Sequence, residues 1–276
     1  MSENCTHDCS SCGENCPSRK GPQSFLVDPL PSTKIKKVIA VESGKGGVGK
    51  SMVTSMMAVA LRREGLKVGI LDADITGPSI PQAFGIHEKA MGNGEDIFPA
   101  ITRTDIKMMS VNLLLEHETD PVIWRGPVIA GMVKQFWSEV LWEELDVLLV
   151  DMPPGTGDVP LTVFQSLPVD GVIVVTSPQE LVGMIVEKAV HMTTTMNIPV
   201  VGIVENMSYF LCPNCGEKHF PYGESHIEET AKNLGIDTIC RLPIRSDLAK
   251  LADTGHIEEA YEPALDEMVK KIKSLS

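Results

Sequence analysis

A glycine-rich motif in this 276-residue chain indicates its fold; it reads Gly44-Lys45-Gly46-Gly47-Val48-Gly49-Lys50-Ser51. It matches the pattern G-x-x-x-x-G-K-[ST], in which glycines let backbone N–H groups close around phosphates. That pattern also needs a lysine that reaches the β and γ oxygens and a hydroxyl that ligates Mg²⁺, and Lys50 and Ser51 stand at those positions. The stretch therefore predicts a loop for a nucleoside triphosphate with Mg²⁺.

A second interpretation of the same glycines is a dinucleotide site. They also satisfy G-x-G-x-x-G, and Asp72 lies 23 residues after Gly49, where such a site places its ribose carboxylate. A dinucleotide has no use for an ammonium and a hydroxyl in the first helical turn, so Lys50 and Ser51 favour the triphosphate. Lys45, on the outer edge of the loop, is poorly placed for the same phosphates and suggests a lysine supplied in trans to a facing subunit.

Short apolar runs alternate with longer segments of helical period from residue 34 onward. The runs are continuous, which is typical of parallel strands buried on both faces. We therefore predict one doubly wound, mostly parallel α/β domain over residues 34–276, with its ligands at the carboxyl ends of the strands. The expected strands are 38–41, 68–71, 147–150, 172–175 and 200–204, and the expected helices are 50–64, 127–144, 159–167 and 180–197.

Acidic residues follow two of the expected strands. Asp72 and Asp74 come directly after 68–71, and Asp151 comes after 147–150. A carboxylate at such a strand end can hold the hydration shell of Mg²⁺ or orient an attacking water. The sequence thus predicts that both acidic segments belong to the nucleotide site.

Six of the seven cysteines lie in two tight clusters. Clustering of this kind, with an odd total, indicates metal or cluster ligation and not a disulfide framework. One cluster lies in residues 1–24, a polar tail that cannot bury a core and that a linker over residues 25–33 joins to the domain. We expect the tail to ligate a metal or cluster, the alternative being a flexible thiol-rich tail; its cysteines are Cys5, Cys9, Cys12 and Cys16.

The other cluster is the pair Cys212-Pro213-Asn214-Cys215. The spacing fits an iron–sulfur ligand pair, and it also fits a zinc knuckle with His219 as a third ligand. Two thiolates do not close a tetrahedral site, so further ligands must come from elsewhere. Iron–sulfur, zinc and a structural or redox loop all remain open at this point.

Four motifs in order resemble one known family. The glycine loop, DADITGPSIP at 72–81, DMPPGTGD at 151–158 and the later cysteine pair are together similar to the Mrp/ApbC family of iron–sulfur cluster carrier ATPases. That family belongs to the deviant-Walker P-loop NTPases, with MinD, ParA and the nitrogenase iron protein. The resemblance covers about residues 35–260 and implies a P-loop NTPase fold and slow ATP hydrolysis.

The resemblance also implies a role for each matching residue. Lys45 would be the signature lysine, Lys50 the phosphate lysine and Ser51 the Mg²⁺ ligand. Asp72 and Asp74 would form the first switch, and Asp151 would be the Walker B acid. Asn206 would read the adenine edge, and Pro243 would lie in the loop that flanks the base. The remaining nucleotide-binding positions are Gly44, Gly46, Gly47, Val48, Gly49 and Met52.

For the cysteine pair, the resemblance implies a homodimer. Cys212 and Cys215 of two subunits would give four thiolates for one bridging cluster, [4Fe-4S] by expectation, which the protein passes to apo iron–sulfur proteins. The tail spacing departs from the family pattern, so a second cluster there is an expectation from the tail cysteines themselves. The rival functions are a MinD- or ParA-like positioning ATPase, which leaves the cysteines unexplained, and a zinc-stabilised regulatory ATPase.

Composition excludes several other classes. With 24 Lys plus Arg against 37 Asp plus Glu, the net charge of −13 does not suit a nucleic-acid binder. No apolar run approaches the ~18 residues of a membrane span, and the N-terminus lacks the features of an export signal. We therefore expect a cytoplasmic protein that binds neither nucleic acid nor membrane.

Overall fold

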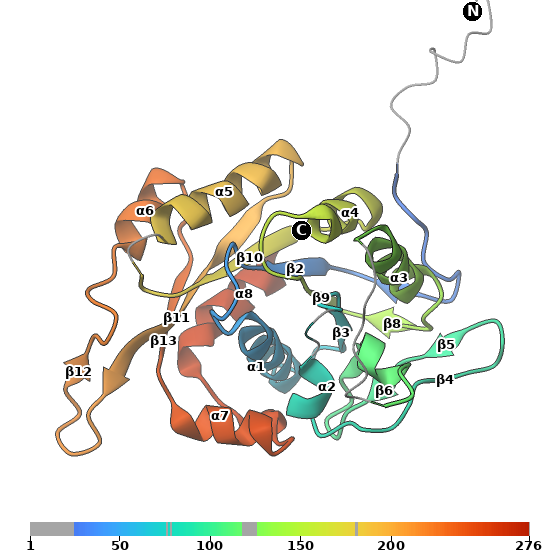
Figure 1. Cartoon of the computed structure of the whole chain (residues 1–276), viewed down its shortest axis with the longest axis horizontal. Helices are drawn as coiled ribbons and strands as arrows, with labels where there is room; N and C mark the ends of the chain where they lie inside the picture. The colour runs from blue at the N-terminus through green and yellow to red at the C-terminus, as the bar shows by residue number, and fades with distance from the viewer. Residues whose placement is uncertain (1–24, 76, 78, 118–125, 180–181, 276) are drawn as a thin grey trace, which may run out of the picture.

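The computed structural model describes residues 25–75, 77, 79–117, 126–179 and 182–275 (Figure 1). The predicted tail, with Cys5, Cys9, Cys12 and Cys16, lies outside the described residues. A nine-stranded sheet forms the centre, in the order β12-β11-β10-β2-β9-β3-β7-β6 with β13 beside β11. The predicted α/β fold with a mostly parallel sheet is confirmed. The parallel strands are β2 (Val38–Glu42), β3 (Val68–Asp72), β7 (Lys107–Met109), β9 (Val147–Asp151), β10 (Gly171–Thr176), β11 (Val200–Leu211) and β13 (Ile239–Pro243).

Short antiparallel pairings close both edges of this sheet. At one edge β6 (Ala100–Ile101) pairs with β7, and at the other β12 (Lys218–His219) pairs with the end of β11. Two small sheets lie beside it. They consist of β1 (Lys34–Ile35) with β8 (Glu144–Leu145), and of β4 (Met91–Gly92) with β5 (Ile97–Phe98).

Helices cover both faces of the sheet because each central strand is apolar on both sides. In β2, Val38 and Ala40 belong to one core cluster, whereas Ile39 and Val41 belong to the other. The first cluster includes side chains from α3 (Gly126–Ser138), α4 (Asp158–Ser166), α5 (Val182–Thr195) and α6 (Ile227–Asn233). The second includes side chains from α1 (Lys50–Arg63), α2 (Ile80–Ala83), α7 (Ser246–Asp253) and α8 (Asp266–Ser274), with the 3-10 turns η2 (Val111–Leu113), η3 (Ile257–Glu259) and η4 (Pro263–Leu265).

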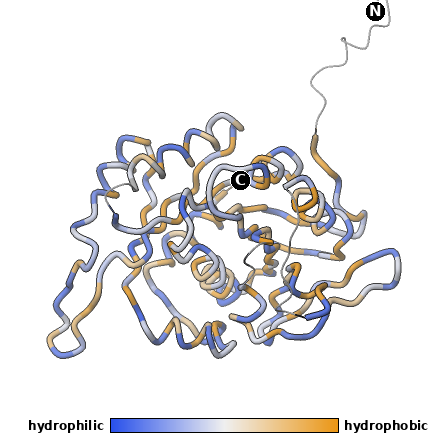
Figure 2. Tube along the Cα trace, in the orientation of Figure 1, coloured by the Kyte–Doolittle hydropathy of each residue, from blue (hydrophilic) through white to orange (hydrophobic). Residues whose placement is uncertain are grey.

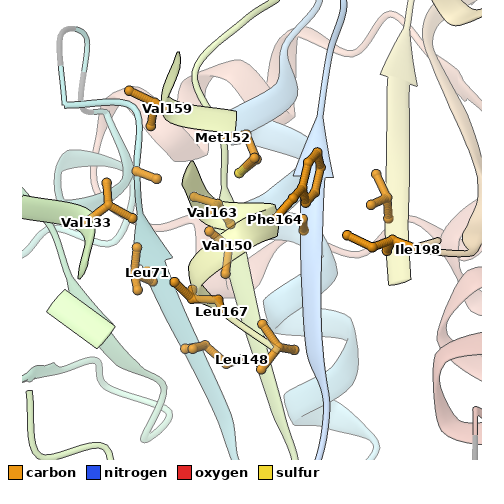
Figure 3. Close-up of a cluster of buried hydrophobic side chains, with 14 of the residues drawn as sticks. Leu71, Val133, Leu148, Val150, Met152, Val159, Val163, Phe164, Leu167 and Ile198 are labelled. Atoms are coloured by element: carbon orange, nitrogen blue, oxygen red, sulfur yellow. The ribbon is translucent and has the colours of Figure 1, made fainter. Parts of the chain in front are cut away.

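The packing between sheet and helices is visible at the centre of the first cluster. Figure 3 shows Leu148 and Val150 of β9 facing Val163 and Phe164 of α4. Leu148 and Val150 are fully buried and Phe164 is 5% exposed. Figure 2 shows the same pattern over the chain, with apolar segments in the central strands and hydrophilic segments in the outer loops. Because β2, β9 and β3 are parallel, their carboxyl ends, where the predicted site lies, are on the same side of the sheet.

One expectation about local structure was wrong, and one strand of the sheet was not expected. The helix expected over 127–144 ends at Ser138, and Trp142 lies outside it with its indole N–H donating to Phe136 O at 3.0 Å. Strand β7 was not expected, because three residues are too few to show a period. The segment expected to be a linker packs against the domain, since Val27 N–H donates to Ser166 O at 2.9 Å.

The last helix, α8, has one apolar face, and that face is buried. Met268, Val269 and Ile272 lie in the core cluster beside α1 and β13. Among the helices of the described residues, none has the length and apolar character needed to cross a membrane. The apolar face of α8 is therefore part of the protein core.

Candidate nucleotide site and cysteine hairpin

The glycine loop connects the end of β2 to the start of α1. Gly47 and Gly49 both have positive φ angles, of 80° and 79°. A Cβ at Gly49 would lie 2.3 Å from Nδ2 of Asn206, so this position has room only for glycine. Helix α1 begins at Lys50 and has no acidic residue in its first turn. Its free N–H groups and the helix dipole therefore favour an anion at the loop.

Lys50 lies in a buried cluster with Asp151. Its Nζ is 2.9 Å from Asp151 Oδ1 and 3.8 Å from Asp74 Oδ2, and the side chain is 6% exposed. The hydroxyl of Ser51 donates to Asp151 Oδ2 at 2.6 Å, and that of Thr54 donates to Oδ1 at 2.7 Å. The predicted phosphate lysine, Mg²⁺ ligand and Walker B acid are thus in direct contact.

Asp72 lies beside Asp151 because β3 and β9 pair in parallel with these two residues in register. Its carboxylate accepts hydrogen bonds from Ser110 Oγ at 2.9 Å and from Asp74 N–H at 3.1 Å. Burial raises the pKa of Asp72 well above its usual range, and the neighbouring charge of Asp151 raises it further, against smaller opposing effects of Ser110 and Lys50. Such a group holds its charge more easily once a cation is added.

Contacts with other segments position Lys45 and the predicted adenine-side residues Asn206 and Pro243. Lys45 is exposed, and its Nζ donates to Gln179 Oε1 in the loop after β10. Asn206 Nδ2 donates to Val48 O at 2.9 Å, which places Asn206 against the glycine loop. Pro243 pairs in register with Tyr209 at the end of β13. The structure thus groups Lys50, Ser51, Asp72, Asp74 and Asp151 tightly, with Asn206 against the loop and Lys45 turned toward Gln179.

The predicted cysteine pair lies in a hairpin at the end of β11. Figure 1 shows this hairpin, with β12, projecting from one edge of the molecule. Cys212 N–H donates to Glu217 O and Gly216 N–H donates to Cys212 O, which closes a tight turn. The N–H groups of Cys215 and then Asn214 lower the pKa of the Cys212 thiol, because they stabilise its thiolate. The turn is therefore preorganised for a thiolate ligand.

His219, the third ligand of the zinc alternative, is exposed on β12 and pairs in register with Phe210. Among the described residues, no set of three or more His, Cys, Asp and Glu side chains is arranged to hold a metal ion. Within one described subunit the hairpin thus offers two thiolates.

Several residues of the site were missed from the sequence. Thr54 lies four residues after Lys50 on α1 and could have been found from helical spacing. Ser110 and Gln179 follow short or irregular segments, and no sequence pattern pointed to either residue. Glu42, the last residue of β2, is fully buried with both oxygens unpartnered in the described structure, and burial raises its pKa to about 8. This carboxyl is therefore mostly protonated at neutral pH and adds little charge beside the loop.

Asp72→Asn should stabilise the nucleotide-free protein at neutral pH. The folded-state pKa of Asp72 is raised, so its ionisation opposes folding once the pH exceeds the unfolded value near 4. Asparagine keeps the volume and can still accept from Asp74 N–H. We expect a higher Tm than wild type at pH 7 and a difference that shrinks as the pH falls toward 4. Thermal melts across this range, with exposed Asp237→Asn as control, test this; a lower Tm at pH 7 would contradict it.

Comparison with known proteins identifies relatives of this chain over most of its length. The chain is 49% identical over 233 residues to an iron-sulfur cluster carrier protein of Clostridium perfringens, covering 82% of each. It is 46% identical over 242 residues to one of Methanocaldococcus jannaschii, covering 87% of this chain and 83% of the relative. A solved nucleotide-binding protein in complex with ADP from Archaeoglobus fulgidus is 47% identical, with a TM-score of 0.76 over 84% of this chain and 91% of that one. The cell division ATPase MinD of Pyrococcus furiosus, at 19% identity, covers 87% of this chain and all of that one with a TM-score of 0.63 and shares the fold.

A parallel sheet, a glycine loop leading into a helix that starts Lys50-Ser51, and a buried aspartate on the adjacent strand define a P-loop NTPase. The model of the ParA family described as NUBPL iron-transfer P-loop NTPase matches residues 34–275. The chain belongs to this family.

Proposed function

We propose that this protein is an iron–sulfur cluster carrier that binds and slowly hydrolyses ATP and passes its cluster to apo-proteins. The observation that carries the proposal is a hairpin turn with Cys212 and Cys215 on a P-loop NTPase. In this turn the pKa of the Cys212 thiol is lowered by backbone N–H groups. The carrier relatives and the family of iron-transfer NTPases support it.

The nucleotide half of the function rests on the buried cluster around Lys50. Its ammonium would meet the β and γ oxygens, and the α1 N-terminus would meet the phosphates. Ser51, Asp151 and Asp72 supply hydroxyl and carboxylate oxygens, the ligands that Mg²⁺ prefers, so these residues fit that ion. Bound Mg²⁺ would neutralise phosphate charge. Asp72 and Asp151 would orient the attacking water, directly or through the ion's hydration shell. Asn206 would read the adenine edge, and Pro243 would lie in the loop that flanks the base.

The cargo half of the function requires a second subunit. Cys212 and Cys215 give two thiolates, and a cluster held by cysteines takes four. A two-fold axis near the hairpin would supply the other two and would leave a [4Fe-4S] cluster near the surface, from which it can depart. Apolar side chains flank the cysteines and would be covered in such a dimer. They are Phe210, Leu211, Phe220 and Tyr222, exposed by 39%, 44%, 39% and 46%.

Lys45 would act across the same interface. Its side chain is exposed and donates a hydrogen bond to Gln179. We propose that it reaches the nucleotide of the facing subunit and assists hydrolysis there, as an arginine finger does. Hydrolysis would then depend on the dimer.

The proposal also includes the N-terminal tail and the cellular compartment of the protein. Cys5, Cys9, Cys12 and Cys16 would hold a second cluster. Cys212, Cys215 and Cys240 are free thiols in the structure, and a reducing compartment such as the cytoplasm keeps them so. The acidic net charge of −13 argues against nucleic acid as a partner, and the buried face of α8 gives no support to membrane attachment.

The test is cluster loading and transfer. Full-length protein is loaded anaerobically with iron and sulfide, its metal content and visible and EPR spectra are recorded, and it is mixed with an apo [4Fe-4S] dehydratase plus an iron chelator. We expect recovery of dehydratase activity despite the chelator, with a dependence on Mg-ATP. Zinc in place of iron would favour the regulatory ATPase, and ATP turnover without iron binding would favour a positioning ATPase.

A further inference from the structure

Glu205 is a buried carboxylate that stands outside the nucleotide cluster. It lies in β11, is 1% exposed, and pairs in register with Thr176 of β10 and Arg241 of β13. A buried charge in such a position requires partners, because its desolvation is costly. The identity of those partners shows what the residue does.

The partners of Glu205 come from both ends of the cysteine hairpin. Ser208 Oγ, before the hairpin, donates to Glu205 Oε2 at 2.6 Å, and Ser225 Oγ, after it, donates to Oε1 at 2.5 Å. Arg241 Nε lies 3.3 Å from Oε2 and also donates to Ser208 Oγ at 3.0 Å. One carboxylate therefore closes the base of the loop that carries Cys212 and Cys215.

An irregularity in β11 makes this closure possible. Met207 has a positive φ of 56°, and the pairing of β11 with β13 shifts register between Glu205 and Tyr209. A bulge of this kind re-aims the side chains that follow it. It lets Ser208, three residues on, face the same carboxylate.

The same segment contacts the nucleotide loop. Asn206, the residue next to Glu205, donates to Val48 O at 2.9 Å and faces Gly49. Its own Oδ1 accepts from Met207 N–H at 2.9 Å. The Asn206 side chain therefore links the glycine loop to the backbone at residues 206 and 207, between Glu205 and Ser208.

There is room beside Glu205 for the hairpin to move. A cavity of about 310 Å³ is lined by Glu205, by Tyr222 and Ser225 of the returning hairpin segment, and by Gln179 of the loop after β10. Gln179 is also the acceptor of the Lys45 hydrogen bond. The cavity thus lies between the base of the hairpin and the loop after β10, whose Gln179 is hydrogen-bonded to Lys45 of the glycine loop.

We propose that Glu205 is a positioning residue that couples occupancy of the nucleotide loop to the orientation of the hairpin bearing Cys212 and Cys215. The coupling rests on the proposed function, since it would let nucleotide state control how the thiolates present a cluster. Asn206 follows the glycine loop through its hydrogen bond to Val48. Glu205 holds both ends of the hairpin at this point of β11, so the hairpin turns as a unit.

The test uses full-length, metal-free protein, so its result does not depend on whether a cluster binds. The rates at which Cys212 and Cys215 are alkylated by iodoacetamide are measured by peptide mass spectrometry, with and without saturating Mg-AMPPNP. We expect the nucleotide to change the rates in wild type by about fivefold or more, the usual scale of coupling between sites. In Ser225→Ala and Glu205→Gln we expect that difference to disappear while calorimetry shows unchanged nucleotide affinity.

Two controls separate coupling from general damage. Ser138→Ala removes a comparable hydroxyl bond on α3, and Glu258→Gln alters another buried carboxylate that accepts from Thr104. Both should keep the wild-type difference. If Glu205→Gln fails to fold, Ser225→Ala decides alone. A nucleotide effect that is absent in wild type, or that survives in Ser225→Ala, overturns the coupling; cluster loading, measured separately, reports on the proposed function.

Discussion

Lys50→Ala is expected to remove most of the affinity for nucleoside triphosphate. The loop loses the ammonium that would contact the β and γ oxygens, and hydrogen bonds of charged groups contribute about 2 kcal/mol, or about thirtyfold in Kd. The nucleotide-free variant should also melt at a lower temperature, because Asp151 loses the cation 2.9 Å from its Oδ1. Calorimetric titration with ATP and thermal melts measure the two effects.

Lys45→Ala is the matched control, since it makes the same change five residues away on an exposed side chain. We expect its nucleotide affinity and Tm to stay at the wild-type level and its ATPase rate to fall. Equal loss of affinity in both variants would contradict a role for Lys45 in trans. A wild-type rate of ~10 s⁻¹ or more, typical of a kinase, would contradict the expected slow switch.

Cys215→Ser is expected to abolish iron binding at the hairpin. The measurement is made in a full-length protein whose tail cysteines are replaced by serine, so that only the hairpin site is counted. The parent should bind about four iron atoms per dimer for [4Fe-4S], or about two for [2Fe-2S], and the Cys215→Ser variant close to none. Loss of the shared cluster should also weaken the dimer, which sedimentation measures.

Cys240→Ala is the control for this experiment. Cys240 is 2% exposed, and burial raises its pKa to about 11, so it remains a thiol in the core. We expect the iron content of Cys240→Ala to equal that of the parent. A monomer that holds a full cluster would exclude the bridging arrangement, and one zinc per dimer without iron would support the knuckle.

Local patterns allowed much of the fold and part of the site to be predicted. The five apolar runs became strands because a segment buried on both faces must be apolar throughout. Asp72 and Asp151 meet because parallel strands end at the same edge of the sheet. The helix expected to reach residue 144 was too long, since the apolar residues after Ser138 pack as extended chain and not as helix.

The chemically important groups of this protein could be predicted from local sequence patterns, namely the loop of a P-loop NTPase, the acids beside it and the cysteine pair at positions 212 and 215. The contacts that connect these groups became visible in the three-dimensional structure alone. The contacts of Ser110 with Asp72, of Gln179 with Lys45, and of Ser225 and Arg241 with Glu205 join residues that are 20 or more positions apart in the chain. A motif is a local pattern, whereas such contacts depend on strand register and on the paths of loops, which no local pattern encodes.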